Sequence, residues 1–290
     1  MRRVLTALAS VAIAVPVAAQ GVQLAPYKDR MFALPKVIES RDGGSYRLVD
    51  YSEGRDVNGR DEVPGRKVRS RYVSLRPRRS EQQLSVDVGG RSVPYLAAGR
   101  VAAPSVVTIY VHGRGGDRRQ GMNDRSFGGN FNRLKNLMVR NGGLHLSPDI
   151  ADDPGVAVRT VRALVEKHGG TRNVVIACGS QGSFVCFELL RDGSARPRLA
   201  GIALLGGFPD RTVLEGSALR GPPIPIYLGH GTRDSVYPAR DVAALYDAIR
   251  GAVPGYPVRL VLFESGIHGT PIRMTDWRET INWMLRGGRA

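Results

Sequence analysis

The feature that most constrains the fold is a regular alternation, beginning after Pro104, of short apolar runs, glycine-rich bends and helical stretches. The apolar runs lie at 106–111, 144–146, 174–177, 202–205, 224–228 and 258–263. The helical stretches lie at about 129–140, 155–168, 182–192, 238–250 and 276–286. Continuous apolar runs are typical of strands that a parallel sheet buries on both faces. The pattern therefore predicts a parallel sheet with connecting helices.

The residues before Pro104 predict antiparallel strands. Residues 69–75 alternate between polar and apolar, and the runs 84–88 and 91–96 flank Gly89-Gly90 in the manner of a β-hairpin. We therefore expect the α/β class: a mostly parallel central sheet with antiparallel N-terminal strands and helices on both faces. In such sheets, functional residues follow the carboxyl ends of the strands.

Residues 1–19 predict a signal peptide. Arg2-Arg3 precede an apolar run, and Val17-Ala18-Ala19 places small residues before a cleavage site at Gln20. A retained membrane anchor is the alternative, but Pro16 argues against it because a full span needs ~20 apolar residues. We expect an exported protein, periplasmic or secreted, without stable membrane insertion after cleavage.

Two segments follow the predicted signal peptide. Residues 20–67 are polar and show no sustained period, so they predict a loosely packed N-terminal extension. Residues 68–290 carry all the predicted strands and helices, and this length suits one domain with one core.

The charge, histidine and cysteine content of the chain limits which binding partners, metals and cofactors we expect. The formal charge of +16 favours anionic molecules or surfaces, but the arginines are spread along the chain and no cluster predicts nucleic-acid binding. Scattered histidines and the lack of a Cys-x-x-Cys pattern predict no metal site and no cofactor. Cys178 and Cys186 are expected to be buried thiols, although an exported location allows a disulfide.

A serine follows the third apolar run of the parallel region. Ser180 stands in Cys178-Gly179-Ser180-Gln181-Gly182, immediately before a predicted helix. A serine on such a strand-turn-helix needs small residues two places before and after it, and Cys178 replaces the usual first glycine. Ser183 fits this pattern less well. Ser180 is therefore the candidate nucleophile, and a plain glycine turn capped by its hydroxyl is the alternative.

An aspartate and a histidine follow two later strands, which gives the chain order Ser, Asp, His that this arrangement requires. Asp234 lies in Gly231-Thr-Arg-Asp-Ser-Val-Tyr-Pro238, and His268 lies in Gly266-Ile-His-Gly269. A serine hydroxyl needs a histidine to accept its proton, and the histidine needs an acid to hold its tautomer. Each residue alone has a structural interpretation, as a helix cap or a loop residue. Their joint position at three strand ends predicts a catalytic triad.

A glycine-rich turn, His112-Gly-Arg-Gly-Gly116, follows the first parallel run. Its backbone, together with that of the nucleophile turn, offers N–H donors for an oxyanion. Arg114 and Gln181 are the candidate donors, and His112 is expected to orient the loop rather than to react. A phosphate-binding loop is the alternative, but the turn lacks the length and the lysine of a Walker motif.

These four motifs resemble those of the α/β-hydrolase family, the esterase, lipase and thioesterase group, over residues 68–290. The resemblance implies the α/β-hydrolase fold for this domain. It also implies the roles derived above: Ser180 as nucleophile, His268 as base, Asp234 as acid, and backbone donors at Arg114 and Gln181. In some members the acid follows the preceding strand, which makes Asp210 the reserve.

The expected activity is hydrolysis of carboxylic esters or thioesters. Family members often insert a cap before the acid-bearing strand, but only Gly206–Pro223 are available here, so we expect no large cap and a small-molecule or polymer-borne substrate. An acyltransferase or peptidase would use the same triad, and a non-catalytic binding protein would lack part of it. Four arginines at the active edge either recognise an anionic substrate group or are solvated: Arg114, Arg118, Arg119 and Arg233.

Overall fold

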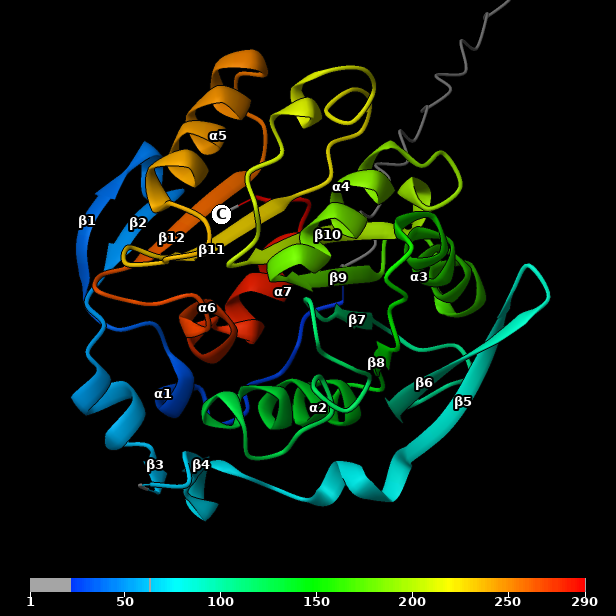
Figure 1. Ribbon diagram of the computed structural model, residues 1–290, viewed down its shortest axis with the longest axis horizontal. Coiled ribbons are helices and arrows are strands. Elements are labelled where there is room, and N and C mark those ends of the chain that lie inside the picture. The colour runs from blue at the N-terminus through cyan, green and yellow to red at the C-terminus, as the bar shows by residue number, and fades with distance from the viewer. Residues whose placement is uncertain (1–21, 63, 290) are drawn as a thin grey trace, which may run out of the picture.

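The computed structural model describes residues 22–62 and 64–289 (Figure 1). The predicted signal peptide lies outside the described residues. No helix among the described residues is both long and apolar enough to cross a bilayer.

A ten-stranded sheet forms the centre of the molecule, in the order β1-β2-β12-β11-β10-β9-β7-β8-β6-β5. Six of its parallel strands coincide with the apolar runs of the sequence. They are β7 (Val107–Val111), β8 (Leu144–Pro148), β9 (Val174–Gly179), β10 (Leu199–Leu205), β11 (Ile226–Gly231) and β12 (Val258–Phe263). Nearly every residue of these strands is buried, which explains why the runs are continuous rather than alternating.

The predicted hairpin is confirmed. Strands β5 (Glu81–Val88) and β6 (Arg91–Gly99) pair antiparallel, and β6 joins the sheet by antiparallel pairing with β8. The prediction for residues 69–75 is wrong, because Ser70–Tyr72 form a short 3-10 turn. In that turn the N–H groups of Tyr72 and Val73 donate to carbonyls three residues earlier instead of to a neighbouring strand.

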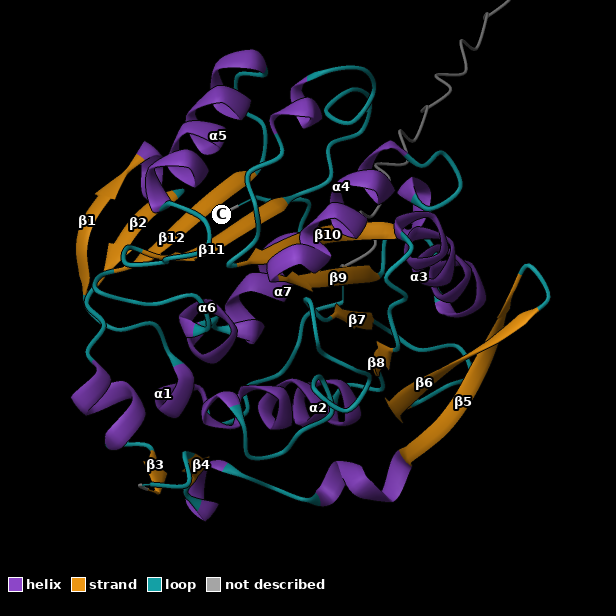
Figure 2. Ribbon diagram, in the orientation of Figure 1, coloured by secondary structure: helices purple, strands orange, loops and turns teal. Residues whose placement is uncertain are grey.

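Helices cover both faces of the sheet, as expected (Figure 2). One face carries α3 (Pro154–His168), α4 (Ser183–Arg191) and α5 (Ala239–Ala252). The other carries α2 (Asn130–Arg140), α6 (Thr270–Met274) and α7 (Trp277–Leu285). Alternate residues of each strand enter the two core layers, so that Ile176 and Cys178 face the first set of helices while Val175 and Ala177 face the second.

Helix α3 begins where the sequence predicts. Asp153 caps it by accepting a hydrogen bond from Val156 N at 2.7 Å, and Pro154 occupies the first turn. The connection from β10 to β11 contains only a short 3-10 turn, Arg211–Leu214, which confirms that no large cap is inserted there. The α/β fold class with a mostly parallel sheet is therefore confirmed.

The expectation of a loosely packed extension is wrong for the described part of residues 20–67. Strands β1 (Val37–Arg41) and β2 (Tyr46–Val49) form an antiparallel pair, and β2 adds to the main sheet parallel to β12. Every residue of β1 is exposed, as befits an edge strand, so no apolar period marks it in the sequence. The segment also carries α1 (Asp29–Phe32) and β3 (Asp61–Glu62), which pairs with β4 (Lys67–Val68).

Candidate active site

Ser180 lies at the sharp turn between β9 and α4. A 3-10 turn at Ser180–Gly182 links the two elements, and Ser180 has a φ of +50°. A residue with a side chain adopts this left-handed conformation only where the surrounding structure enforces it. The turn places the serine at the carboxyl edge of the sheet, as the sequence predicts.

The structure brings the three triad candidates into one hydrogen-bonded chain. Ser180 Oγ lies 2.8 Å from His268 Nε2, and His268 Nδ1 lies 2.8 Å from Asp234 Oδ2. Asp234 follows β11 and His268 follows β12, so each group extends from the end of a different strand. A carboxylate that accepts Nδ1–H leaves Nε2 free to accept the serine proton.

The environment of Asp234 keeps its carboxylate ionised. Burial alone would raise the pKa, but the hydrogen bonds from His268 and from the N–H groups of Tyr237 and Val236 outweigh it and hold the pKa below its ordinary value. His230 also lies beside it, with Nε2 3.3 Å from Asp234 Oδ2. Burial lowers the pKa of His230, and its Nε2–H donates to Tyr237 O at 2.7 Å. His230 thus supports the acid loop, a role that the sequence analysis missed.

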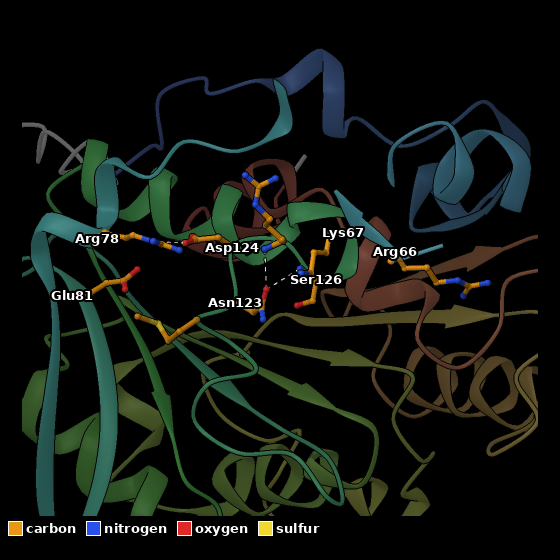
Figure 3. Close-up of a pocket in the computed structure, with 10 residues that line it drawn as sticks. Arg66, Lys67, Arg78, Glu81, Asn123, Asp124 and Ser126 are labelled. Atoms are coloured by element: carbon orange, nitrogen blue, oxygen red, sulfur yellow. Dashed lines mark hydrogen bonds and ion pairs between the residues drawn. The ribbon is translucent and has the colours of Figure 1, made fainter. Parts of the chain in front are cut away.

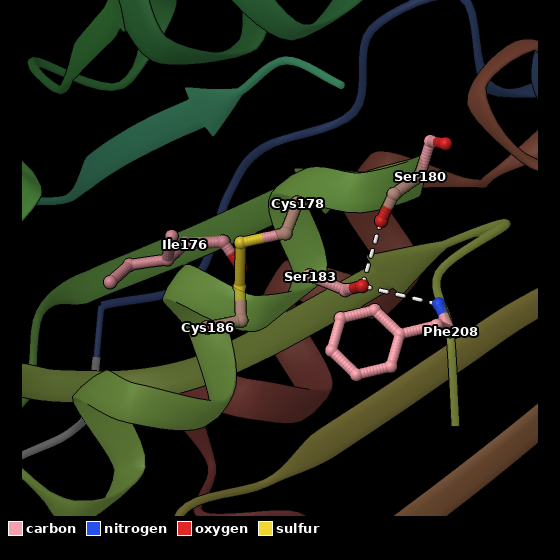
Figure 4. Close-up of a disulfide and its surroundings, with 6 residues drawn as sticks. All are labelled: Ile176, Cys178, Ser180, Ser183, Cys186 and Phe208. Carbon is pink, nitrogen blue, oxygen red and sulfur yellow. Dashed lines mark hydrogen bonds between the residues drawn. A yellow bond between two sulfur atoms is a disulfide. The ribbon is translucent and has the colours of Figure 1, made fainter. Parts of the chain in front are cut away.

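Cys178 and Cys186 form a disulfide, contrary to the expectation of buried thiols (Figure 4). Their Cα atoms are 6.3 Å apart, because the tight turn at Ser180–Gly182 brings the first turns of α4 back beside the end of β9. This separation lies within the range of about 4.4–6.8 Å that a disulfide spans. Both side chains are fully buried.

A second contact holds the same turn. Ser183 Oγ donates to Ser180 O at 2.7 Å and accepts from Phe208 N at 3.2 Å (Figure 4). The Ser183 hydroxyl is therefore engaged by backbone groups, whereas the Ser180 hydroxyl faces the histidine.

The glycine-rich loop after β7 passes directly against the serine. A Cβ added to Gly113 would lie 2.8 Å from Ser180 Cβ and 3.4 Å from Ser180 Oγ, so only glycine allows this approach. His112 Nδ1–H donates to Gly113 O at 2.9 Å, and its Nε2 accepts from Ile150 N at 3.1 Å. With both ring nitrogens engaged by backbone, His112 orients the loop, as the sequence indicates.

The two candidate oxyanion donors lie side by side on these turns. Arg114 Nε donates to Gln181 Oε1 at 3.0 Å, which ties the glycine-rich loop to the nucleophile turn. Gln181 follows Ser180 in the 3-10 turn, and Arg114 follows Gly113 in the loop that contacts Ser180. The structure therefore brings together all five residues singled out in the sequence: Ser180, Asp234, His268, Arg114 and Gln181.

An open cleft of about 460 Å³ contains Ser180 and His268. Its walls also include side chains that the sequence analysis did not single out: Tyr110, Gln120, Phe127, Leu205, Tyr237 and Ile272. Tyr110 lies near the end of β7, a position that the strand-end rule could have marked. A second hollow of about 420 Å³ lies beyond the glycine-rich loop, and Arg114 and Gln181 line both.

A larger hollow, about 700 Å³, lies away from the triad (Figure 3). It is lined by charged groups that are largely paired: Arg78 contacts Asp124 at 2.9 Å, and Glu81 contacts the buried Lys135 at 2.6 Å. None of its lining residues is a histidine or a cysteine. No group of His, Cys, Asp or Glu in residues 22–62 and 64–289 is arranged to hold a metal ion.

Asp210, the reserve acid, lies outside the hydrogen-bonded chain. Its Oδ1 accepts from Thr212 N at 2.9 Å and caps the 3-10 turn before β11.

Two of the four arginines at the active edge are paired with carboxylates, Arg118 with Asp149 and Arg119 with Asp117.

Comparison with known proteins gives structural but no sequence relatives. No family model and no curated protein match the chain. A thermostable esterase aligns with a TM-score of 0.55 at 16% identity, covering 72% of this chain but only 63% of its own. An esterase from Pyrococcus furiosus gives 0.51 at 12% identity over 71% of this chain and 92% of its own. An acylaminoacyl peptidase from Pyrococcus horikoshii gives 0.51 at 12% identity over 70% and 40%.

The sheet order, the strand-end positions of the three residues and these structural neighbours together define the class. The chain has the α/β-hydrolase fold.

Proposed function

We propose that this protein is a serine hydrolase that cleaves carboxylic ester or thioester bonds through an acyl-enzyme on Ser180. The observation that carries the proposal is the hydrogen-bonded chain from Ser180 through His268 to Asp234, with both distances at 2.8 Å. The turn that presents the serine and the open cleft beside it support the same function.

The first half-reaction forms the acyl-enzyme. Ser180 Oγ attacks the acyl carbon while His268 Nε2 accepts the hydroxyl proton, and Asp234 stabilises the resulting imidazolium. The carbonyl oxygen becomes an oxyanion, which the backbone N–H groups of Gln181 and Arg114 would stabilise; a strong donor contributes about 3–4 kcal/mol. The tetrahedral intermediate then expels the alcohol or thiol, which takes the proton from His268.

The second half-reaction releases the acid. A water molecule attacks the acyl carbon and gives a proton to His268 Nε2, and collapse of the second intermediate returns that proton to Ser180 Oγ. The open cleft gives water access to this step. Because the connection from β10 to β11 holds no large cap and the cleft is open, small or polymer-borne esters suit the site as substrates.

The neighbours and the site favour an enzyme over a binding protein. Two of the structural neighbours described above are esterases and one is a peptidase. Ligand binding alone does not require serine, histidine and aspartate within hydrogen-bond distance of one another. The strained φ of Ser180 adds to this argument, because such strain persists where function requires it.

We also propose that the protein is exported to the periplasm or secreted. The N-terminal sequence has the pattern of a signal peptide. The Cys178–Cys186 disulfide supports the same location, since disulfides persist mainly in oxidising compartments.

Hydrolysis of p-nitrophenyl acetate and butyrate tests the proposed activity. We expect turnover by the wild-type protein and loss of about 10³-fold or more in Ser180→Ala. Ser194→Ala is the matched control, because its exposed hydroxyl contacts only Glu166 and Asp192, and it should keep the activity of the wild-type protein. Equal rates for wild type and Ser180→Ala would refute the proposal.

A further inference from the structure

Arg114 differs from Arg118 and Arg119, the two arginines at the active edge that are paired with carboxylates. Arg118 and Arg119 each contact an aspartate, but within residues 22–62 and 64–289 no carboxylate lies within ion-pair distance of Arg114. Its only side-chain hydrogen bond among these residues is from Nε to the neutral Oε1 of Gln181. The side chain is exposed.

The same hydrogen bond orients the guanidinium. With Nε engaged by Gln181, the edge formed by Nη1 and Nη2 has no partner in the described chain. That edge presents two parallel N–H donors, the geometry that binds a carboxylate in a bidentate manner. Gln181 adjoins Ser180, so this donor edge is held close to the reacting centre.

The cleft itself favours a negative group near Arg114. None of the residues that line the Ser180 cleft is acidic, and Asp152 is the one acidic residue lining the second hollow. Because His268 must protonate the leaving group, that group lies on the histidine side. The acyl substituent would then extend toward the glycine-rich loop, where Arg114 lines both hollows.

We propose that Arg114 is a specificity-determining residue that selects esters whose acyl group carries a carboxylate. The natural substrate class would then be monoesters of dicarboxylic acids or related acids with a negative charge several bonds from the ester carbonyl. This inference rests on the proposed hydrolase function and assigns the side chain a role separate from that of its backbone N–H.

The test compares two substrates that differ only in charge. One is p-nitrophenyl hydrogen adipate, and the other is its analogue in which a carboxamide replaces the terminal carboxylate. We expect the wild-type protein to favour the charged ester by about tenfold in kcat/KM at low ionic strength, and less at high salt. Arg114→Gln should abolish this ratio and Arg114→Lys should keep part of it, because lysine retains charge but not the fork.

Arg233→Gln is the matched control. Arg233 is also an exposed arginine on an active-edge loop, but it does not line the cleft, so its loss should leave the ratio as in wild type. Equal kcat/KM for both esters in the wild-type protein would overturn the inference. So would an unchanged ratio in Arg114→Gln.

A binding measurement separates this inference from the proposed function. If neither ester is hydrolysed, the hydrolase proposal fails, but calorimetric titration of both esters into Ser180→Ala still tests Arg114. Tighter binding of the charged ester, lost in the Ser180→Ala/Arg114→Gln double variant, would support the role of Arg114. Equal affinity for the two esters would reject it.

Discussion

Asp61 of the N-terminal segment holds Arg273, five residues after His268, by two hydrogen bonds of 2.5 and 3.1 Å. Both side chains are almost fully buried. Further contacts join the same parts of the chain, since Glu264 N donates to Val49 O at 3.0 Å and Ser265 Oγ donates to Tyr51 O at 3.2 Å. The N-terminal segment therefore supports the loop that carries the proposed base.

Asp61→Asn should destabilise the protein strongly. Removing one partner of a buried ion pair leaves the other charge unpaired, at a cost of about 3–5 kcal/mol in the free energy of unfolding. Urea unfolding measures this directly. The control is Glu53→Gln, which removes the exposed ion pair with Arg66 in the same segment and should cost less than about 1 kcal/mol. Similar losses in the two variants would show that the segment does not support the core.

Much of the fold could be predicted from the sequence because burial leaves a visible pattern. The six buried runs correctly indicated the parallel strands, and the helical stretch at about 155–168 correctly indicated α3. Strand β1 could not be predicted, because an exposed edge strand held by backbone pairing needs no apolar residues. The Asp61–Arg273 pair was equally hidden, since its residues are 212 positions apart.

The candidate site likewise has residues that the sequence predicts and contacts that it does not. Ser180, Asp234 and His268 follow strand ends, and the strand-end rule brings such residues together. The disulfide depends instead on the angle at which α4 leaves the turn, which residue spacing does not report. The support from His230 depends on the path of the chain after Asp234, and no local motif marks it.

Replacing Cys178 and Cys186 together by alanine should lower stability. In the chain-entropy model a bridge across so short a loop contributes about 2–3 kcal/mol by restricting the unfolded chain. The double variant should therefore unfold at lower urea, while the folded protein keeps the proposed esterase activity because Ser183 still holds the turn. A variant as stable as the wild type would contradict the contribution of the disulfide.

Asp234→Asn should lower kcat by about 10³- to 10⁴-fold, because an asparagine amide facing His268 Nδ1 reverses the tautomer and removes the free lone pair of Nε2. Asp210→Asn is the matched control. Asp210 caps the turn Arg211–Leu214 and does not contact the histidine, so its loss should reduce stability slightly and spare kcat. Loss of activity in Asp210→Asn alone would assign the acid to the reserve residue.

Stability should fall as the pH drops from about 6.5 to about 4. Burial lowers the pKa of both His145 and His168 to about 4, whereas the ordinary value is 6.5. The unfolded chain therefore takes up these protons at a higher pH than the folded protein does, and each histidine costs up to about 3 kcal/mol once the pH has fallen through this range.

Urea unfolding at several pH values between about 7.5 and 4.5 checks this prediction. His168 Nε2 lies 2.9 Å from the hydroxyl of Tyr95, and His168→Gln keeps a polar group there that does not titrate. The variant should show a shallower pH dependence than the wild type. An identical slope in both proteins would mean that His168 does not contribute.

The most direct test of Ser180 as the nucleophile is to label the protein with a fluorophosphonate and locate the modified residue by mass spectrometry. We expect one phosphonyl group per molecule, on Ser180, with loss of labelling in Ser180→Ala and in His268→Ala but not in Ser194→Ala. Absence of labelling in the folded wild-type protein, or labelling that persists in Ser180→Ala, would contradict the assignment of Ser180 as the nucleophile.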